Sequence, residues 1–392
     1  MSMREVAIIG VGMTKFGKFV DRSLKDLGRE ACWNAIKDAG VRPKEIQAGY
    51  MANAAGAVIT GQTMVLGEVA FREVGVISVP IVNIENACAS GSSAVMDAWM
   101  AVSAGFYDLV LVAGVEKLYA NDTQKTVEAL AGAGDVELEM SVGVNFPAHW
   151  ALRATKRMEV FGTRREHFAK VSVKNHHNGC LNPRSQYQKE CTIEQVMNAR
   201  VIASPLTQLE CSPIGDGAAA VVLCEAKLAK KYTARPLLIA GMGMSTGTYN
   251  DTRDITFNDI EKRAALAAYN SASIGPTEID FAEVHDCFTI AEFMRVEGMG
   301  LCRPGEYDCL LERGEVEIGG RLPINPSGGL LAKGHPVGAT GVAQLCELNW
   351  QLKGEAGQRQ VQKARIGLAH CSGGGIAGDG AVSVVSIVKK GY

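Results

Sequence analysis

The sequence predicts an α/β protein whose two similar halves pack in a five-layer α/β/α/β/α arrangement, with a further domain inserted into the first half. Two observations carry this prediction. Short Val-, Ile- and Ala-rich runs alternate with stretches of helical periodicity, which is typical of parallel sheets covered by helices. The same order of segments also occurs twice along the 392 residues, and this length exceeds what one simple domain usually needs.

The internal repeat is visible as four pairs of matching segments in the same order. The pairs are Ile9–Met13 with Ala240–Met244, Ala31–Ile46 with Ala264–Ile279, Ala89–Gly91 with Ala339–Gly341, and Asp216–Val222 with Asp379–Val385. A single match of this kind is compatible with chance. Four matches in one order favour a duplicated unit.

Each half opens with a predicted strand that leads into a predicted helix. The strands are Glu5–Gly10 and Leu237–Gly241. The helices are Leu24–Ala39 and Ile260–Ala272, in which alanines recur at helical spacing. A second strand, another helix and two closing Val-rich strands follow in both halves.

Gly10 and Gly12 form a G-x-G pair of the kind that opens a dinucleotide-binding fingerprint. The next glycine is Gly17, two positions too late for the G-x-G-x-x-G spacing. We therefore interpret the pair as a turn after the first strand.

The two halves differ by an insertion in the first half. Ala89 and Asp216 are 127 positions apart, whereas their counterparts Ala339 and Asp379 are 40 positions apart. The first half therefore holds 87 additional residues.

The expected domain limits follow from this difference. The N-terminal half is residues 1–235, with the inserted domain at about 116–205, and the C-terminal half is residues 236–392. Within the insertion, Trp150–Arg200 holds ten Lys or Arg and four Asp or Glu. This excess suits a ligand with several phosphates, although a solvated helical surface would have the same composition.

The composition argues against several classes of protein. The net charge of −2 offers no basic excess for binding nucleic acid. No apolar run approaches the roughly 18 residues that a membrane helix needs, and we expect no signal peptide. The eleven cysteines include no C-x-x-C pair, which speaks against a zinc ribbon or a disulfide framework. We expect a cytoplasmic protein with no metal and no bound cofactor.

Cys88 lies at a predicted junction between a strand and a helix. It follows the extended run Val79–Glu85 and precedes the small residues Ala89–Ser93. This architecture exposes a nucleophile, and the positive end of a helix would lower a thiol pKa from about 8.5 toward neutrality. The local pattern also fits a buried cysteine at a crowded crossing.

His335 lies in the Gly- and Pro-rich stretch Asn325–Gly338. In the repeat alignment, this turn takes the place that the turn of Cys88 takes in the first half. Pseudo-twofold packing would bring the two turns face to face, and a Cys–His pair is a known activated nucleophile. A lone histidine is more often structural.

His285 and Cys287 follow directly after the predicted strand Asp280–Val284. Ligands bind at the edge where the parallel strands of a sheet end. His285 can donate a hydrogen bond to an oxyanion, and Cys287 can carry a proton. A structural role is the commoner one for such a cysteine.

Cys371 and the glycines Gly373 and Gly374 follow the predicted strand Arg365–Ala369. A phosphate-binding loop would need a Lys-Ser or Lys-Thr pair, which is absent here. The glycines fit a close approach of the backbone to a small, reactive acyl group.

At these motifs the sequence resembles the thiolase family over essentially the whole chain, including the insertion, which thiolases call the loop domain. Asn86–Gly91 resembles the nucleophile motif, Gly334–Pro336 the base motif and Cys371–Gly373 the C-terminal C-x-G motif. His285–Phe288 resembles the sterol-carrier-protein-type thiolases and their archaeal and bacterial relatives, and Asn325–Gly341 and Val173–Gly179 are similar to the archaeal and bacterial group.

The resemblance implies the thiolase fold and cleavage of a 3-oxoacyl-CoA by free CoA, or the reverse Claisen condensation. Cys88 would be acylated with His335 as its base, and His285 with His335 would stabilise the enolate oxygen. The amides of Cys88 and Gly373 would stabilise the tetrahedral oxyanion. CoA is a substrate, and the basic loop domain would hold its phosphates.

The second acid/base is open between two residues. Thiolases with a His-Asp-Cys-Phe motif usually lack the C-terminal cysteine, but this chain has both Cys287 and Cys371. The subgroup pattern slightly favours Cys287.

The resemblance further implies a homodimer and, as in some relatives, a small zinc-containing OB-fold partner protein. The acyl substrate is open between acetoacetyl-CoA and bulkier compounds such as benzoylsuccinyl-CoA. One alternative is a thiolase-fold retro-aldolase that acts on a CoA ester with such a partner, and Cys88 speaks against it. Another is a non-catalytic subunit, against which the intact set of Cys88, His335 and Cys371 speaks.

Overall fold

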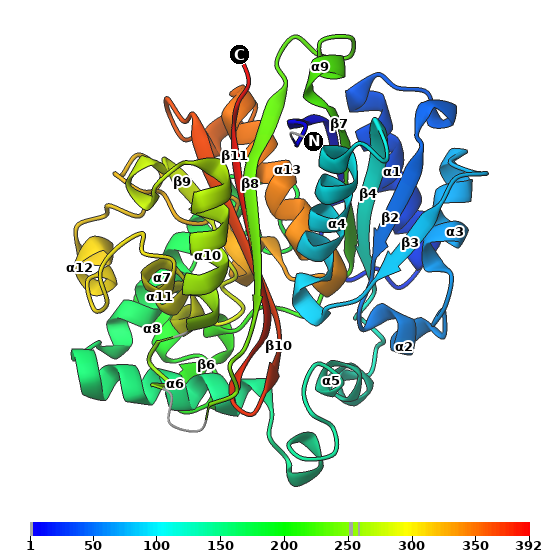
Figure 1. Cartoon of the computed structure of the whole chain (residues 1–392). Helices are drawn as coiled ribbons and strands as arrows, with labels where there is room; N and C mark the ends of the chain where they lie inside the picture. The colour runs from blue at the N-terminus through cyan, green and yellow to red at the C-terminus, as the bar shows by residue number, and fades with distance from the viewer. Residues whose placement is uncertain (1–2, 251–253, 258) are drawn as a thin grey trace.

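The computed structural model describes residues 3–250, 254–257 and 259–392 (Figure 1). The strands of the first half are β1 (Val6–Met13), β2 (Ala48–Ala52), β3 (Ile81–Ile84), β4 (Leu109–Glu116) and β7 (Gly217–Glu225). The strands of the second half are β8 (Leu237–Thr246), β9 (Phe281–Glu283), β10 (Ile366–Ile376) and β11 (Asp379–Lys390). A small separate sheet pairs β5 (Val201–Ala203) with β6 (Leu206–Thr207).

Helices connect these strands in both halves. The first half has α1 (Leu24–Ala39), α2 (Gly56–Thr60), α3 (Leu66–Phe71), α4 (Ser90–Ala104) and α9 (Ala226–Ala229). Between β4 and β7 lie α5 (Thr123–Ala131), α6 (Phe146–Phe161), α7 (Arg165–Cys180) and α8 (Ile193–Met197). The second half has α10 (Asp259–Ala272), α11 (Thr289–Gly298), α12 (Tyr307–Glu312) and α13 (Thr340–Lys353). Within the described ranges, no helix has the length and apolarity needed to span a bilayer.

The two halves have the same strand order, as the repeat predicts. The nine strands form one sheet in the order β3-β2-β4-β7-β1-β8-β11-β10-β9. From the centre outwards, β1, β7, β4 and β2 of the first half correspond to β8, β11, β10 and β9 of the second. The directions correspond as well, because β2 is parallel to β4 and β9 to β10, whereas the inner pairs are antiparallel.

The expectation of parallel sheets therefore holds for the outer strand pairs and is wrong for the inner ones. β7 and β11 each run antiparallel to both of their neighbours. In the second half the reason is direct: only Ala377 and Gly378 separate β10 from β11, and a two-residue connection reverses the chain.

The layered arrangement agrees with the prediction, although the sheet portions of the two halves join at one edge. β1 and β8 pair antiparallel over Val6–Ile8 and Leu237–Ile239. α4 and α13 lie together between the two halves, with α1 and α3 outside the first half and α10 and α11 outside the second (Figure 1). Apolar side chains of α4, α13 and the inner sheet faces merge into one buried cluster.

The starts of α4 and α13 contact each other backbone to backbone. A Cβ atom added to Gly91 would lie 2.9 Å from the carbonyl oxygen of Gly338, and one added to Gly341 would lie 2.4 Å from the nitrogen of Ser92. No larger residue fits at either position without moving a helix. The predicted face-to-face packing of the two turns is thereby confirmed.

The prediction of a helix at Leu24–Ala39 is confirmed at both ends. The hydroxyl of Ser23 accepts a hydrogen bond from the Asp26 amide at 3.1 Å, and Gly40 ends the helix at φ 65°. These are common start and stop signals of helices.

Gly10 and Gly12 do not form a turn, because β1 continues to Met13. Both glycines let α1 pack directly on the strand. A Cβ atom on Gly10 would lie 2.6 Å from the carbonyl oxygen of Ala35, and one on Gly12 would lie 2.2 Å from that of Ala31. The matching glycines of β8 contact α10 in the same way.

The connection between β4 and β7 contains α5 to α8 and the small sheet, whereas the equivalent connection between β10 and β11 is a tight turn. The sequence places its insertion in this connection. The proposed limits of 116–205, and the boundary between the halves after residue 235, stay predictions.

We predict that Gly12→Ala lowers the free energy of unfolding by about 1 to 3 kcal/mol, because the added methyl group overlaps the backbone of α1. Urea denaturation followed by circular dichroism measures this change. Gly28→Ala in α1 is the matched control, since a Cβ atom there meets nothing closer than Ala70 Cβ at 3.4 Å. Equal loss of stability in the two variants would contradict this account of the strand glycines.

Candidate active site

Three side chains from distant parts of the chain meet where the two turns face each other. Cys88 lies in a short helical turn, η3 (Ala87–Ala89), before α4, and His335 precedes η8 (Val337–Ala339), before α13. His285 follows β9. The Cys88 sulfur and one ring nitrogen from each histidine all lie within 4.8 Å of one another. The structure thus brings together the cysteine and the two histidines that the sequence singles out.

His335 is oriented by Thr340. Its Nδ1 atom lies 2.7 Å from Thr340 Oγ1, and that hydroxyl donates its own proton to the Pro336 carbonyl oxygen at 3.0 Å. Thr340 therefore accepts from Nδ1–H, which leaves the lone pair of His335 on Nε2. Nε2 has no hydrogen-bond partner among the described residues. Burial lowers the pKa of His335 to about 3, so the ring is a neutral base.

His285 stands perpendicular to His335, with ring centroids 5.0 Å apart. Its Nδ1 atom lies 3.4 Å from Cys371 Sγ, and the same thiol lies 3.0 Å from the carbonyl oxygen of Cys88. Because Cys371 has one proton, it donates either to that carbonyl or to His285. In the first case His285 has its lone pair on Nε2, and in the second it presents Nε2–H. Burial lowers the pKa of His285 well below its usual value.

Burial raises the pKa of Cys88 to about 12, although the amides of Gly374 and of Cys88 itself favour the thiolate. The expectation of a thiol pKa near neutrality is therefore wrong for the resting site. Loss of water destabilises the thiolate more than the nearby amides stabilise it. Cys88 is consequently a thiol until a base removes its proton, and Nε2 of His335 is such a base.

Gly373 and Gly374 lie inside β10, which continues to Ile376 rather than ending at Ala369. The segment continues as a strand because Gly373 and Gly375, on either side of Gly374, pair with β11. A Cβ atom on Gly373 would lie 2.9 Å from the nitrogen of Cys88, so this glycine permits the expected close approach of two backbones. Gly374, at φ 66°, donates its amide to the Cys88 sulfur.

Cys287 and Cys371 have different surroundings. The side chain of Cys287 packs against the apolar cluster around α11, and the amide of Phe288 donates to its sulfur. Cys371 is fully buried and contacts both Cys88 and His285. Burial raises the pKa of both thiols, so both hold their protons.

A buried polar cluster, centred on Glu292 of α11, supports the loop that carries His285. Its contacts are the amide groups of Asn175 at 3.0 Å and Asn325 at 2.9 Å, the Tyr307 hydroxyl at 2.7 Å and Lys174 Nζ at 3.1 Å. The sequence analysis did not identify Glu292. The sequence did offer one sign of this cluster. Lys174 and Asn175 are polar residues of α7 on a face that packs against α11, where apolar residues would be expected.

Asp286, between His285 and Cys287, extends this cluster toward the turn of His335. Its carboxylate accepts from Asn175 Nδ2 at 2.7 Å and from the Leu330 amide at 2.7 Å. Leu330 belongs to the π-helical turn η7 (Gly329–Lys333). Asp286 therefore fixes the loop of His285 relative to the segment that leads into His335.

Part of the positive charge in Trp150–Arg200 is buried in ion pairs. Arg157 contacts Glu297 and Asp308, both at 2.8 Å. This pairing attaches α6 to α11 and α12. The basic excess of the insertion is thus partly structural, which weakens its interpretation as a phosphate site.

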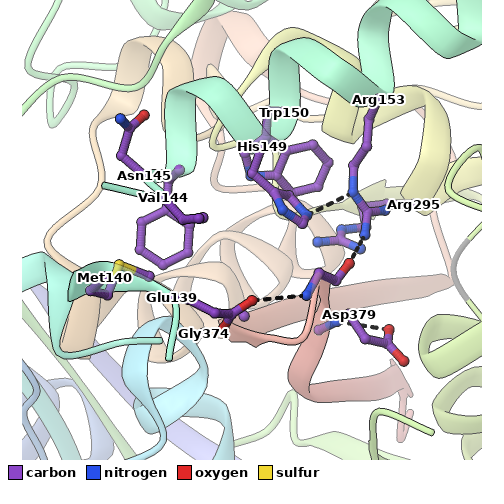
Figure 2. A pocket seen from close by; sticks show the side chains of 14 residues that line it. Glu139, Met140, Val144, Asn145, His149, Trp150, Arg153, Arg295, Gly374 and Asp379 are labelled. Atoms are coloured by element: carbon purple, nitrogen blue, oxygen red, sulfur yellow. Dashed lines mark hydrogen bonds between the residues drawn. The ribbon is translucent and has the colours of Figure 1, made fainter. Parts of the chain in front are cut away.

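A cavity opens beside Gly374, on the side that faces the start of α6 (Figure 2). Arg153 donates to His149 Nε2 at 2.9 Å and to the Gly378 carbonyl oxygen at 2.8 Å. Glu139 accepts from the Gly378 amide at 3.2 Å. These contacts, drawn in Figure 2, tie the insertion to the hairpin between β10 and β11. The cavity has a mixed lining of apolar and polar side chains, and its walls are held together from the insertion and from the hairpin.

We predict that Glu292→Ala lowers the free energy of unfolding by about 3 to 5 kcal/mol, because it leaves Lys174 buried without its counter-ion. Urea denaturation measures the change. The exposed pair of Glu159 with Lys156, 3.0 Å apart, supplies the control: Glu159→Ala should change stability by no more than about 1 kcal/mol. A similar small effect in both variants would show that the buried cluster is dispensable.

Comparison with known proteins gives matches along the whole chain. The family model "Thiolase, N-terminal domain" matches residues 6–227, and "Thiolase C-terminal domain-like" matches residues 241–386. An acetyl-CoA acetyltransferase of Methanothermobacter thermautotrophicus is 45% identical over 98% of this chain and 100% of its own length. Sterol carrier protein 2 of Bos taurus is 36% identical over 99% of this chain and 72% of its own length.

A solved structure shares the fold. The chain of an "Ltp2-ChsH2(DUF35) aldolase" superposes with a TM-score of 0.82 and 24% identity, covering 97% of both chains. At this identity the likeness concerns the fold alone. The matches to both halves, together with a relative that is similar over its full length, establish that this chain belongs to the thiolase family.

Proposed function

We propose that this chain is a CoA-dependent thiolase that cleaves a 3-oxoacyl-CoA with free CoA, or runs the reverse Claisen condensation, through an acyl-Cys88 intermediate. One observation carries the proposal: a neutral His335 with an unpartnered Nε2 lies in the same cluster, 4.8 Å wide at most, as the Cys88 sulfur. Acylation of a cysteine needs such a base. The 45% identical acetyl-CoA acetyltransferase supports the same reaction class.

The first step moves one proton and forms one bond. His335 Nε2 takes the thiol proton of Cys88, and the sulfur bonds to the 3-keto carbon, whose C=O electron pair becomes an oxyanion. We assign its stabilisation to the amides of Cys88 and Gly374, with Gly374 in place of the expected Gly373, because these two amides donate toward the sulfur. One such donor is commonly worth about 3 kcal/mol. Cleavage of the C2–C3 bond leaves acyl-Cys88 and a CoA-ester enolate, and free CoA later takes the acyl group.

The enolate needs a proton at C2, and we assign this proton to Cys371. Its thiol contacts His285 Nδ1 at 3.4 Å, and burial keeps it protonated. When Cys371 shares its proton with Nδ1, His285 presents Nε2–H to the enolate oxygen, as does His335 once it has been protonated. Cys287, which the subgroup pattern favours, is the alternative donor.

The other two functions have less support. A thiolase-fold retro-aldolase has no use for an acylated cysteine, whereas here Cys88 lies against His335 and Cys371. The aldolase of similar structure is 24% identical to this chain, which bears on the fold only. A non-catalytic subunit would likewise not need this set of three side chains.

We propose acetoacetyl-CoA as the first substrate to test, because the 45% identical relative is an acetyl-CoA acetyltransferase. Bulkier 3-oxoacyl-CoAs, benzoylsuccinyl-CoA among them, belong in the same panel. CoA is a substrate, and the steps above use no bound cofactor. Its phosphates would bind those basic residues of Trp150–Arg200 that are not engaged in buried pairs.

We further propose a homodimer that is formed at β3. This strand lies at one end of the sheet, and Val82 on it is 42% exposed. Met64 and Val65, shortly before it in the chain, are 74% and 54% exposed. An unpaired edge strand beside exposed apolar side chains promotes pairing with another chain. The zinc-containing OB-fold partner and the cytoplasmic location are further proposals, which rest on the family resemblance.

We expect Cys88→Ala to abolish CoA-dependent cleavage of acetoacetyl-CoA while the thermal unfolding midpoint stays close to that of the wild type. In the wild type, mass spectrometry after incubation with acetoacetyl-CoA should find a covalent acyl group on Cys88. Cys309→Ser, which changes an exposed cysteine, should keep both properties. Full activity of Cys88→Ala, or cleavage without an adduct, would favour the retro-aldolase.

We expect Cys371→Ala to lower kcat by about 10²- to 10⁴-fold, the usual contribution of a general acid, and Cys287→Ala to lower it less than about 10-fold. Exchange of the C2 protons of acetyl-CoA with deuterated water, followed by mass spectrometry, reports this proton transfer directly. The acyl-Cys88 adduct should still form in Cys371→Ala. The opposite ranking of the two variants would assign the proton to Cys287.

A further inference from the structure

Cys88, His285 and His335 also form a set of donor atoms that suits a metal ion. One ligand atom from each residue lies within 4.8 Å of the other two. Thiolate sulfur and neutral imidazole nitrogen are the donors that Zn²⁺ prefers, whereas Mg²⁺ and Ca²⁺ prefer oxygen. The three residues are far apart in the chain, which is why no metal-ligand spacing is visible in the sequence.

His335 is held as a metal ligand is usually held. Metal-binding histidines almost always donate their second ring N–H to a nearby acceptor, and His335 donates Nδ1–H to Thr340 at 2.7 Å. Its side chain is only 7% exposed, and Nε2 has no partner among the described residues. A buried acceptor without a partner costs free energy. A group that binds Nε2 removes this cost, so its binding is favoured.

His285 can offer the equivalent nitrogen. When the Cys371 thiol donates to the carbonyl oxygen of Cys88, 3.0 Å from its sulfur, His285 donates Nδ1–H to the Cys371 sulfur at 3.4 Å. Its lone pair is then on Nε2, the ring nitrogen on the side away from Nδ1. In this arrangement each imidazole donates from Nδ1 and keeps its lone pair on Nε2, which is the form that binds a cation.

The nearby charges do not exclude a cation. Lys333 pairs with Glu283 at 3.2 Å, and Arg295 pairs with Glu261. The carboxyl group of Glu116 is close enough to the thiol to oppose its ionisation, and in its ionised form it favours a positive ion. Cys88 is partly exposed as a whole residue, which gives an ion a path from solvent, although burial of its sulfur dominates the thiol pKa.

We propose that Cys88, His285 and His335 bind one thiophilic divalent cation of the Zn²⁺ class, and that the bound ion blocks the enzyme. Binding breaks the S–H bond of Cys88, releases that proton to solvent and forms a sulfur–metal bond. The two imidazole nitrogens fill two more positions of a tetrahedral site, and water or a thiol from solution fills the fourth. The inhibition rests on the proposed function, because the ion would occupy the same three side chains that the reaction uses. The binding does not depend on that function.

Titration calorimetry of Zn²⁺ into the reduced, metal-free full-length chain tests the site. We expect one ion per chain. Cys88→Ala and His335→Gln should each weaken binding by about 100-fold or more, and Thr340→Val, which removes the support of His335, by about 10- to 100-fold. Cys309→Ser should bind like the wild type, because that exposed cysteine lies outside the cluster. Unchanged Zn²⁺ affinity in Cys88→Ala would overturn the proposal.

A second measurement uses the wild-type chain alone, so it does not depend on the folding of variants. Stoichiometric Zn²⁺ should protect Cys88 from iodoacetamide while Cys309 still reacts, as read by peptide mass spectrometry. Zn²⁺ should also stop thiolysis, and EDTA should restore it. Unprotected Cys88 would overturn the binding, and full activity with saturated sites would overturn the blocking. Protection of Cys88 in a chain without thiolase activity would support the site and contradict only the proposed function.

Discussion

The backbone contact between the starts of α4 and α13 determines the geometry of the whole site. Gly91 and Gly341 allow the two helices to meet without a side chain between them, and a Cβ atom on Gly341 would already lie 2.4 Å from a backbone nitrogen of α4. Each half contributes the turn before its own helix, so Cys88 comes from one half and His335 from the other. Neither half holds the pair alone. The repeat thus has a direct consequence: two copies of one unit, related by a pseudo-twofold axis, place two different residues at equivalent points of one interface.

Burial in this interface sets the protonation of both groups. It raises the pKa of Cys88 to about 12 and lowers that of His335 to about 3, so each is neutral at rest. Burying a neutral pair costs less free energy than burying a thiolate and an imidazolium. For the charged pair, the loss of hydration offsets most of the electrostatic attraction. Burial also leaves Nε2 of His335 without a partner. The free lone pair on Nε2 can accept the proton of Cys88, and it can also bind a soft cation.

Local pattern and the repeat were sufficient to predict much of the fold, and tertiary contacts explain the rest. Helix α1 starts and ends as expected because Ser23 and Gly40 act on their own neighbours. The direction of the inner strands was predicted wrongly, because a Val-rich run does not show which strands it will pair with. Gly10 looked like a turn because its actual role, contact with a helix, depends on residues far along the chain. Likewise, the start of the helix that follows Cys88 depends on local residues and was recognised, whereas the larger effect of burial on the pKa of its thiol was not.

Glu116 illustrates why some residues around a site escape sequence analysis. Alone in sequence it resembles any glutamate at the end of a strand, yet its buried carboxyl group accepts from the amides of Gly338 at 2.9 Å and Ala54 at 3.2 Å. Burial raises its pKa to about 7. Since this exceeds the usual glutamate pKa of 4.5, its contribution to stability is greatest below pH 4.5 and is lost as the pH rises to about 7. The protein thus gives up some stability at neutral pH to hold the turn of His335 from the opposite half. Thr340 orients the ring from within its own half, and Glu116 places the turn from the other.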